Sequence, residues 1–407
     1  MSKIEDLIKQ YCPNGCEWKR LGDVYTRLRG TPITAGKMKE IADENGDIRI
    51  FAGGKTVINA FEKDIPKANI TRIPAVLVQS RGVIDFVYYD KPFTFKNEMW
   101  AYTHKDIVSV QYLNYILKNN VRKFRDEASG MGSMPQISLS VTEDFQIPVP
   151  PLPVQEEIVR ILDEFTELEK ELEKELEMRK KQYEWYRDEL LTFGDDVERK
   201  KLGEIMTIQR GASPRPISKY ITEDSNGVNW IKIGDTSTDS KYVVSCVEKI
   251  TQEGAKKSRF LKAGSFILSN SMSFGRPYIL KIDGCIHDGW ISMTDFENTI
   301  TPDFLYHVLM SSVIQYEMRQ KASNGGAVSN LNSDIVKSIE IPVPPLQEQQ
   351  RIVEILDTFD TLTTDLTKGL PAEIKMRRMQ YEYYRDYLFG LLKANVCISV
   401  TKGNEND

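Results

Sequence analysis

Two long stretches of the chain carry hydrophobic residues at every third or fourth position, with Glu and Lys between them. This spacing predicts amphipathic helices, and so narrow an apolar stripe is typical of a coiled-coil seam. The predicted helices cover residues 151–195 and 345–395. The seam positions are Ile158, Leu162, Phe165, Leu168, Leu172, Leu176, Tyr183 and Tyr186 in the first helix, and Ile352, Leu356, Phe359, Leu362, Leu366, Tyr381 and Tyr384 in the second.

Both predicted helices follow the same proline-rich hexapeptide. The sequence Ile-Pro-Val-Pro-Pro-Leu at Ile147–Leu152 returns unchanged at Ile341–Leu346. Because its prolines are incompatible with a helix interior, it predicts a stiff, extended connector before each helix. Further on, Tyr183–Asp188 returns with one substitution as Tyr381–Asp386. A duplication of this length predicts two similar halves that grip something at two places.

The likeness of the two seams favours pairing of the two helices over two ordinary core helices, since similar seams can bury each other. The second copy is four residues longer, and the difference falls around Lys368–Pro371, where a helix can kink or restart. We expect a charged residue at Leu172 or Leu366 to loosen this pairing or the docking of partners. We expect the aromatic residues at Tyr183–Tyr186 and Tyr381–Tyr384 to lock its register.

The stretches before the helices match at their edges and differ in the middle. Lys19–Val24 resembles Lys200–Ile205, and an Arg-Gly pair follows in both halves at Arg29-Gly30 and Arg210-Gly211. Alternating patterns predict strands at Ile48–Phe51, Ala75–Gln79, Val83–Tyr89, Val228–Ile233 and Ser265–Leu268, and helices at Val110–Asn119 and Asp303–Gln320.

These patterns predict an α+β protein with two pseudo-symmetric α/β domains, each followed by a long helix, the two helices pairing as an antiparallel coiled coil. The predicted segments are a first domain at 1–150, a helix at 151–195, a second domain at 196–344, a helix at 345–395 and a flexible tail at 396–407.

The net charge of −5 argues at first against a nucleic-acid partner. The acidic residues are concentrated in the repeated segments, because residues 147–200 hold 16 Asp and Glu against 9 Lys and Arg. Residues 1–146 instead hold 21 Lys and Arg against 18 Asp and Glu. Local positive patches on the two domains are therefore compatible with the overall charge.

Motifs for catalysis or metal binding are not found. Phe51–Thr56 ends like a phosphate-binding loop, but Arg49 stands where that motif needs glycine. Cys12 and Cys16 have no second close cysteine pair to complete a zinc site. We therefore expect a non-catalytic chain with no metal site. Without a signal peptide or a membrane-length apolar stretch, we expect reduced thiols and a cytoplasmic location.

The divergent middles of the two halves contain side chains suited to DNA. Arginine can contact guanine edges and phosphates with two hydrogen bonds, and Lys, Ser, Thr and Gln supply further contacts. Each such residue alone is equally well explained as a solvated surface charge, but their matching places in both halves favour a shared role. The candidates are Arg27, Arg29, Thr31, Lys37, Lys55, Gln79, Ser80 and Arg81 in the first half, and Arg210, Ser213, Arg215, Lys219, Lys232, Ser271 and Arg276 in the second.

The duplicated frame resembles the specificity subunit of type I restriction–modification systems. The resemblance rests on the repeated Ile-Pro-Val-Pro-Pro-Leu, Ile-Val-x-Ile-Leu-Asp and Tyr-Glu-aromatic-Tyr-Arg-Asp motifs, and it covers essentially the whole chain. Trp230–Asp235 also looks like a recurrent strand of the family's target-recognition domains. The resemblance implies two such domains, each reading one half of a bipartite, asymmetric DNA site.

The resemblance also implies that the helices set the half-site spacing and dock two modification (methyltransferase) subunits, onto which restriction subunits assemble. S-adenosylmethionine, ATP and Mg²⁺ would then belong to those partners, whose complex methylates adenine and cleaves DNA, and this chain would hold no cofactor. Two other hypotheses remain open: a coiled-coil protein–protein adaptor without a DNA role, and a self-contained enzyme. Steep weakening of DNA binding by salt would exclude the adaptor, and lack of product from the purified chain would exclude the enzyme.

Overall fold

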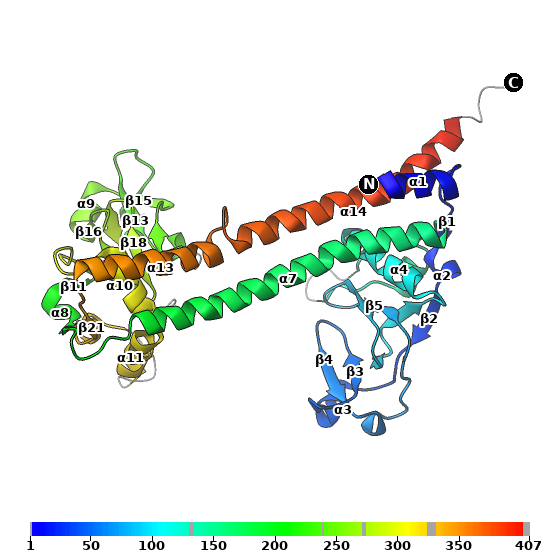
Figure 1. Cartoon of the computed structure of the whole chain (residues 1–407), viewed down its shortest axis with the longest axis horizontal. Helices are drawn as coiled ribbons and strands as arrows, with labels where there is room; N and C mark the ends of the chain where they lie inside the picture. The colour runs from blue at the N-terminus through cyan, green and yellow to red at the C-terminus, as the bar shows by residue number, and fades with distance from the viewer. Residues whose placement is uncertain (1, 130–133, 238–239, 271–273, 324–330, 402–407) are drawn as a thin grey trace. The chain divides into compact units, whose positions relative to one another are not determined.

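A computed structural model describes residues 2–129, 134–237, 240–270, 274–323 and 331–401. The chain divides into two compact units (Figure 1). Unit 1 comprises residues 1–169 and 377–407, and unit 2 comprises residues 170–376. Both units mix helices with short strands, as the sequence predicts. The first unit is discontinuous, because it takes its last segment from the C-terminal part of the chain.

Unit 1 contains many short elements before its long helix. They are α1 (Ser2–Tyr11), β1 (Trp18–Arg20), α2 (Leu21–Val24), β2 (Thr26–Arg29), α3 (Ala35–Ile41), β3 (Ile48–Phe51), β4 (Val57–Ala60), η1 (Glu62–Asp64), β5 (Ala75–Gln79), β6 (Asp85–Tyr89), β7 (Phe93–Phe95), β8 (Trp100–Thr103), α4 (Ile107–Asn119), α5 (Val121–Asp126), α6 (Leu139–Glu143) and β9 (Gln146–Pro148).

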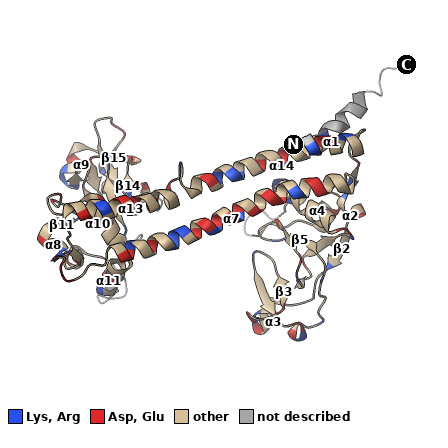
Figure 2. Cartoon of the chain, viewed as in Figure 1, with Lys and Arg blue, Asp and Glu red and all other residues tan. Residues whose placement is uncertain are grey.

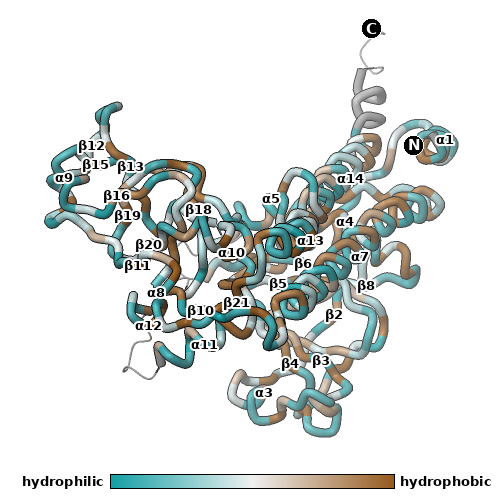
Figure 3. Tube along the Cα trace, turned by 60° about the vertical axis from the view of Figure 1, so that its left-hand side comes forward, coloured by the Kyte–Doolittle hydropathy of each residue, from teal (hydrophilic) through white to brown (hydrophobic). Residues whose placement is uncertain are grey.

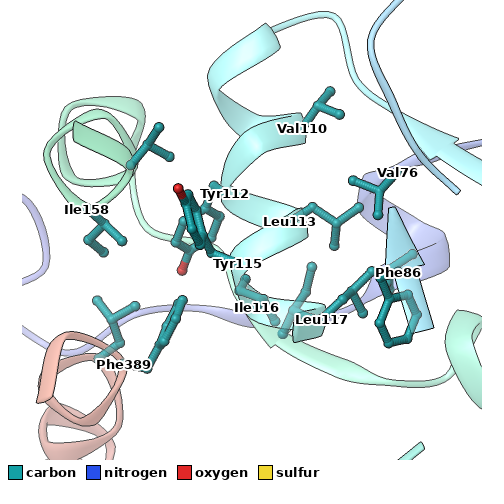
Figure 4. Close-up of a cluster of buried hydrophobic side chains, with 14 of the residues drawn as sticks. Val76, Phe86, Val110, Tyr112, Leu113, Tyr115, Ile116, Leu117, Ile158 and Phe389 are labelled. Carbon is teal, nitrogen blue, oxygen red and sulfur yellow. The ribbon is translucent and has the colours of Figure 1, made fainter. Parts of the chain in front are cut away.

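The strands of unit 1 form three sheets. One sheet has the strand order β2-β8-β5-β6, a second has the order β4-β3-β7, and β1 pairs with β9. Helix α4 packs on β5 and β6. Figure 4 shows the core between them, where Leu113 and Leu117 of α4 lie near Val76 and Phe86 of the sheet. All four side chains are fully buried, so this helix-on-sheet contact stabilises the unit.

Unit 2 repeats this plan with additional strands. Its elements are β10 (Arg199–Lys201), α8 (Leu202–Ile205), β11 (Thr207–Arg210), η2 (Ile217–Lys219), β12 (Ile221–Thr222), β13 (Val228–Ile231), η3 (Ile233–Asp235), β14 (Tyr242–Val243), β15 (Glu248–Ile250), α9 (Gln252–Lys256), β16 (Arg259–Leu261), β17 (Phe266–Ser269), β18 (Pro277–Leu280), β19 (Gly284–Ile286), β20 (Trp290–Thr294), α10 (Pro302–Met310), α11 (Ser312–Ser323), α12 (Ser333–Lys337) and β21 (Glu340–Pro342).

The sheets of unit 2 correspond to those of unit 1. Their strand orders are β11-β20-β17-β18-β14, β12-β15-β13-β19-β16 and β10-β21. The repeated proline segments occupy equivalent strands, because Ile147 lies opposite Lys19 in β9–β1 and Ile341 lies opposite Lys200 in β21–β10. The matching edges of the two halves are therefore the strands that close each domain.

Three long helices follow the domains: α7 (Leu152–Leu190), α13 (Leu346–Thr364) and α14 (Leu370–Thr401). In unit 1 the start of α7 runs antiparallel to α14, with Phe165 stacked on Tyr384 at 5.2 Å between ring centroids. In unit 2 the end of α7 lies against α13, where Tyr186 stacks on Phe359 at the same separation. Hydrophobic and hydrophilic residues alternate along these helices (Figure 3). The predicted antiparallel helix pair is therefore confirmed.

The second helical segment is broken, as the insertion around Lys368–Pro371 suggests. Asp365 ends α13, and its carboxylate accepts hydrogen bonds from the backbone N–H groups of Thr367 and Lys368. Leu366 was expected in the seam, but it lies in this turn and is 61% exposed. The other predicted seam residues are buried or half-buried. Helix α14 runs six residues past the predicted end at 395, since no Gly or Pro lies there to end it.

The prediction of a single helix at 303–320 was wrong, because the structure has two separate helices there, α10 and α11. Ser311 leaves the helical conformation, its hydroxyl donates to the Val308 carbonyl, and the backbone N–H of Ile314 in the next helix donates to that hydroxyl. Predicted strands near 83–89, 228–233 and 265–268 exist with ends shifted by one or two residues.

A repeated aspartate joins each domain to its long helices. In unit 1, Asp163 of α7 accepts a 2.5 Å hydrogen bond from the hydroxyl of Tyr115 on α4. In unit 2, the equivalent Asp357 of α13 lies 2.8 Å from His307 Nε2 of α10 and 2.8 Å from Lys241 Nζ. Tyr183 of α7 completes the second joint, with its hydroxyl 3.1 Å from His307 Nδ1.

Candidate nucleic-acid interface

In each unit the arginine of the Arg-Gly pair ends a strand, and the glycine that follows packs closely against the end of a second strand. A Cβ atom added at Gly30 would lie 2.1 Å from the carbonyl oxygen of Phe95, and one at Gly211 would lie 2.1 Å from the carbonyl oxygen of His287. Only glycine allows so close a backbone approach. Phe95 ends β7 and His287 directly follows β19, so the β7–β8 loop of unit 1 and the β19–β20 loop of unit 2 begin at equivalent places.

In unit 2, candidate side chains from distant segments meet at Asp288 in the β19–β20 loop. Its carboxylate accepts hydrogen bonds from Ser213 Oγ at 2.8 Å and from Arg215 Nη2 at 3.3 Å. Its backbone carbonyl accepts from Arg210 Nε at 3.0 Å and from Asn270 Nδ2 at 3.1 Å. We call these five residues the Asp288 cluster.

The surroundings of Asp288 favour its charged form. Partial burial raises the pKa of this carboxyl group, but the Ser213 hydroxyl and the nearby charges of His287, Arg210 and Arg215 outweigh it, so the pKa lies below its ordinary value. A cavity of about 750 Å³ opens beside the cluster, and Lys232, paired with Glu248, lies on its wall. Pro214, Pro216, Ile217, Ile221 and Trp230 supply apolar surface to the same cavity.

In unit 1 the corresponding loops also come together. Ser80, at the end of β5, donates a 2.9 Å hydrogen bond to the carbonyl of Glu98 in the β7–β8 loop, as Asn270 does to Asp288 in unit 2. The Glu98 carboxylate pairs with Lys96 at 2.8 Å. The exposed Arg81 donates to Gln136 at 2.8 Å. The turn that carries Lys55 adjoins Arg81, because the Gly54 N–H donates to the Arg81 carbonyl.

Several candidates from the sequence lie apart from these clusters. Thr31 is fully buried and shares a 2.7 Å hydrogen bond with Thr94, and Gln79 is also buried, so both support the fold from inside. Arg27 pairs with Glu143, and Lys37 pairs with Glu40 on α3. The others are Arg29, exposed at the end of β2, Lys219, exposed at the end of η2, Arg276, half-buried beside the Tyr278 ring, and Ser271, which lies outside the described residues.

The loop residues Lys96, Glu98, His287 and Asp288 were missed. The sequence contains one signal for them, because an acidic residue stands two positions before a tryptophan in both halves, at Glu98-Met99-Trp100 and Asp288-Gly289-Trp290. Each tryptophan begins a central strand, β8 or β20, so the acidic residue is held in the loop just before it.

In unit 2 the guanidinium groups of Arg210 and Arg215 lie beside Asp288, and in unit 1 that of Arg81 lies beside Gln136. Exposed guanidinium groups beside such acceptors are suited to reading base edges and binding phosphates. Among the described residues, no group of three or more His, Cys, Asp and Glu side chains could hold a metal ion. None of the helices in the described ranges is long and apolar enough to cross a membrane.

Two pseudo-symmetric α/β domains, each joined to a long helix, define a class of proteins whose chain is internally duplicated. The family model described as type I restriction modification DNA specificity domain matches residues 13–178 and 194–376, and the chain belongs to this family. It is accordingly a specificity subunit, and catalysis in type I systems lies in other subunits.

Individual relatives agree with this assignment. The specificity subunit of the type I restriction enzyme EcoR124I/EcoR124II from Escherichia coli is 32% identical over 97% of this chain and 98% of its own length. The crystal structure of a type I restriction–modification S subunit from M. genitalium has a TM-score of 0.54 at 17% identity, covering 93% of this chain and 96% of that one. A chain from a study of type I complex assembly and conformational transition has a TM-score of 0.58 at 16% identity, covering 92% and 97%. At such identities the two structures support the fold alone.

Proposed function

We propose that this chain is the DNA-reading subunit of a type I restriction–modification complex, in which each α/β unit reads one half of a bipartite, asymmetric site. The proposal rests on the equivalent loops of the two units, which hold the Asp288 cluster in unit 2 and the residues around Lys96 and Glu98 in unit 1. Gly30 and Gly211 support the same loop in both units, but that loop presents Lys96 and Glu98 in one and Asp288 in the other. One frame with two different polar surfaces suits the reading of two different sequences.

The long helices would set the half-site spacing and dock two modification subunits. Trp185 of α7 and Tyr383 of α14 hold equivalent places in the repeat and are 58% and 65% exposed. Exposed aromatic residues are frequent anchors at interfaces, and two equivalent anchors suit two copies of one partner. Lys, Arg, Asp and Glu are interspersed along both helices, which would give these anchors a polar rim (Figure 2).

The remaining components would belong to the partners. Restriction subunits would assemble onto the modification subunits, and S-adenosylmethionine, ATP and Mg²⁺ would bind to these partners rather than to this chain. The complex would then act in the cytoplasm, where it meets DNA.

Co-expression with the cognate modification subunit, followed by sequencing of methylated sites, tests the proposal. We expect a bipartite motif, of which only one half changes when residues 1–146 are exchanged for those of a relative. Binding of the assembled complex should also weaken steeply with salt, because each phosphate contact releases counterions. Absence of a bipartite motif, or an exchange that leaves both halves unchanged, would refute the proposal.

A further inference from the structure

The Asp288 cluster gathers two arginines of unit 2 on one acidic residue. Arg210 ends β11, Arg215 follows five residues later, and Asp288 lies far along the chain in the β19–β20 loop. Arg210 binds the Asp288 backbone carbonyl through Nε, and Arg215 binds its carboxylate through Nη2. Each guanidinium therefore uses one of its donors on the same residue, and its other donors have no hydrogen-bond partner among the described residues.

Asp288 is itself held firmly. Ser213 Oγ donates to its carboxylate, and its carbonyl also accepts from Asn270, whose side chain is 7% exposed. The neighbouring His287 ring packs edge-on against the fully buried Trp230, with 6.0 Å between centroids. The acceptors of Asp288 are thus fixed by the fold, whereas the Arg215 side chain that they orient is 82% exposed.

Arginine needs such support to read sequence. A guanidinium group recognises guanine through two parallel hydrogen bonds to O6 and N7, and this contact discriminates only if the planar group is correctly oriented. A flexible arginine without an anchor binds phosphates as readily as bases, and phosphates carry no direct sequence information.

We propose that Asp288 is a positioning residue of the second recognition domain, which orients Arg210 and Arg215 toward guanines in one half-site without contacting a base itself. This inference rests on the proposed function and deepens it, because it names the base type that unit 2 reads and the residue that enforces the reading.

The charge of Asp288 gives the inference a distinctive signature. Asp288→Asn removes one negative charge from a DNA-facing surface, so electrostatic binding to any duplex should stay equal or become tighter. The same change releases Arg215, so discrimination at guanine positions should fall by about tenfold. A residue with a merely structural role would instead weaken binding to all duplexes together.

The experiment selects bound duplexes from a random-sequence library with the complete complex, using wild type, Asp288→Asn and two controls. Asp283→Asn removes the same charge from an exposed site paired with Lys262, and it should keep all base preferences. Asp288→Glu keeps the carboxylate and should retain most of the guanine preference. We expect Asp288→Asn to lose guanine preference at the position that Arg215 reads, in a single half-site, because Arg210 keeps its hydrogen bond to the backbone carbonyl.

The possible failures are distinguishable. If the wild-type complex selects no motif, the proposed function and this inference both fall. If wild type selects a bipartite motif and Asp288→Asn keeps every base preference, only the inference falls. Loss of a cytosine preference alone would also overturn it, because Asp288 would then read the base directly.

Discussion

Replacing Lys241 with Met should destabilise the packing of α10 against α13 in unit 2. The lysine is 8% exposed, and its Nζ lies 2.8 Å from Asp303 and 2.8 Å from Asp357, each 37% exposed. Loss of one partner from a buried ion pair costs about 3–5 kcal/mol. Because water reaches both carboxylates, we expect about 2–3 kcal/mol. Methionine keeps the apolar stem, so the loss reports the charge.

Hydrogen exchange measured by mass spectrometry on the full chain is the appropriate assay, because it separates the two units. Exchange in peptides of α10 and α13 should accelerate by roughly 30-fold to 150-fold, while peptides of residues 1–146 stay near wild type. The control Lys262→Met removes an exposed lysine, 75% exposed and paired with Asp283, and should change exchange little. Equal protection in Lys241→Met and wild type would refute the reasoning.

The pH dependence of this difference has a defined sign. Partial burial raises the pKa of Asp357, but hydrogen bonds from His307 and Lys241 outweigh it, so its folded pKa lies below the ordinary value. A depressed carboxyl pKa contributes stability that is present above the unfolded pKa and is lost as pH falls through the folded one. The gap between wild type and Lys241→Met should therefore be full at neutral pH and shrink below about pH 4.

Three further predictions concern substitutions of single residues. Leu172→Glu, at an 8% exposed seam position, should cost about 3 kcal/mol in urea unfolding, whereas Leu366→Glu, at 61% exposure, should stay within about 0.5 kcal/mol. Burial raises the pKa of Asp360, so Asp360→Asn should stabilise the chain at neutral pH. This gain should shrink as pH falls through the raised folded pKa and be absent below the unfolded pKa of about 4; an unchanged unfolding midpoint at pH 7 would contradict this. Gly211→Ala should cost about 1–3 kcal/mol in urea unfolding and disturb recognition of one half-site alone in methylation sequencing, because its Cβ would overlap the His287 carbonyl.

The architecture could be predicted from the sequence because its signals are local and repeated. The apolar period of the helices, the prolines before them and the Arg-Gly pairs all occur twice, so each copy supports the other. The break after Thr364 was only partly foreseen, because the apolar spacing continues to Leu366 while Asp365 already caps a turn. The split at Ser311 escaped because a serine side chain can replace a backbone hydrogen bond without interrupting the apolar pattern.

The candidate interface could be predicted only in part. The arginines and serines on loops are visible as residue types, but their partner Asp288 lies more than 70 residues away from each of Arg210, Ser213 and Arg215. Nothing in the local sequence links residues at such separations, since the fold alone brings them together. Burial is equally hidden: Thr31 stands beside an Arg-Gly pair in a polar segment, yet its hydroxyl bonds to Thr94 in the interior.

The discontinuity of unit 1 has a consequence for synthesis of the chain. Leu388, Phe389 and Leu392 of α14 belong to the same buried cluster as α1 and α4, and Tyr387 donates a hydrogen bond to Glu5. Unit 2, in contrast, is one continuous stretch, residues 170–376. On the ribosome the second domain can therefore complete its core before the first, reversing the usual N-terminal-first order. Until α14 emerges, the earliest-made half exposes apolar surface, and there a nascent chain is most open to chaperones and proteases.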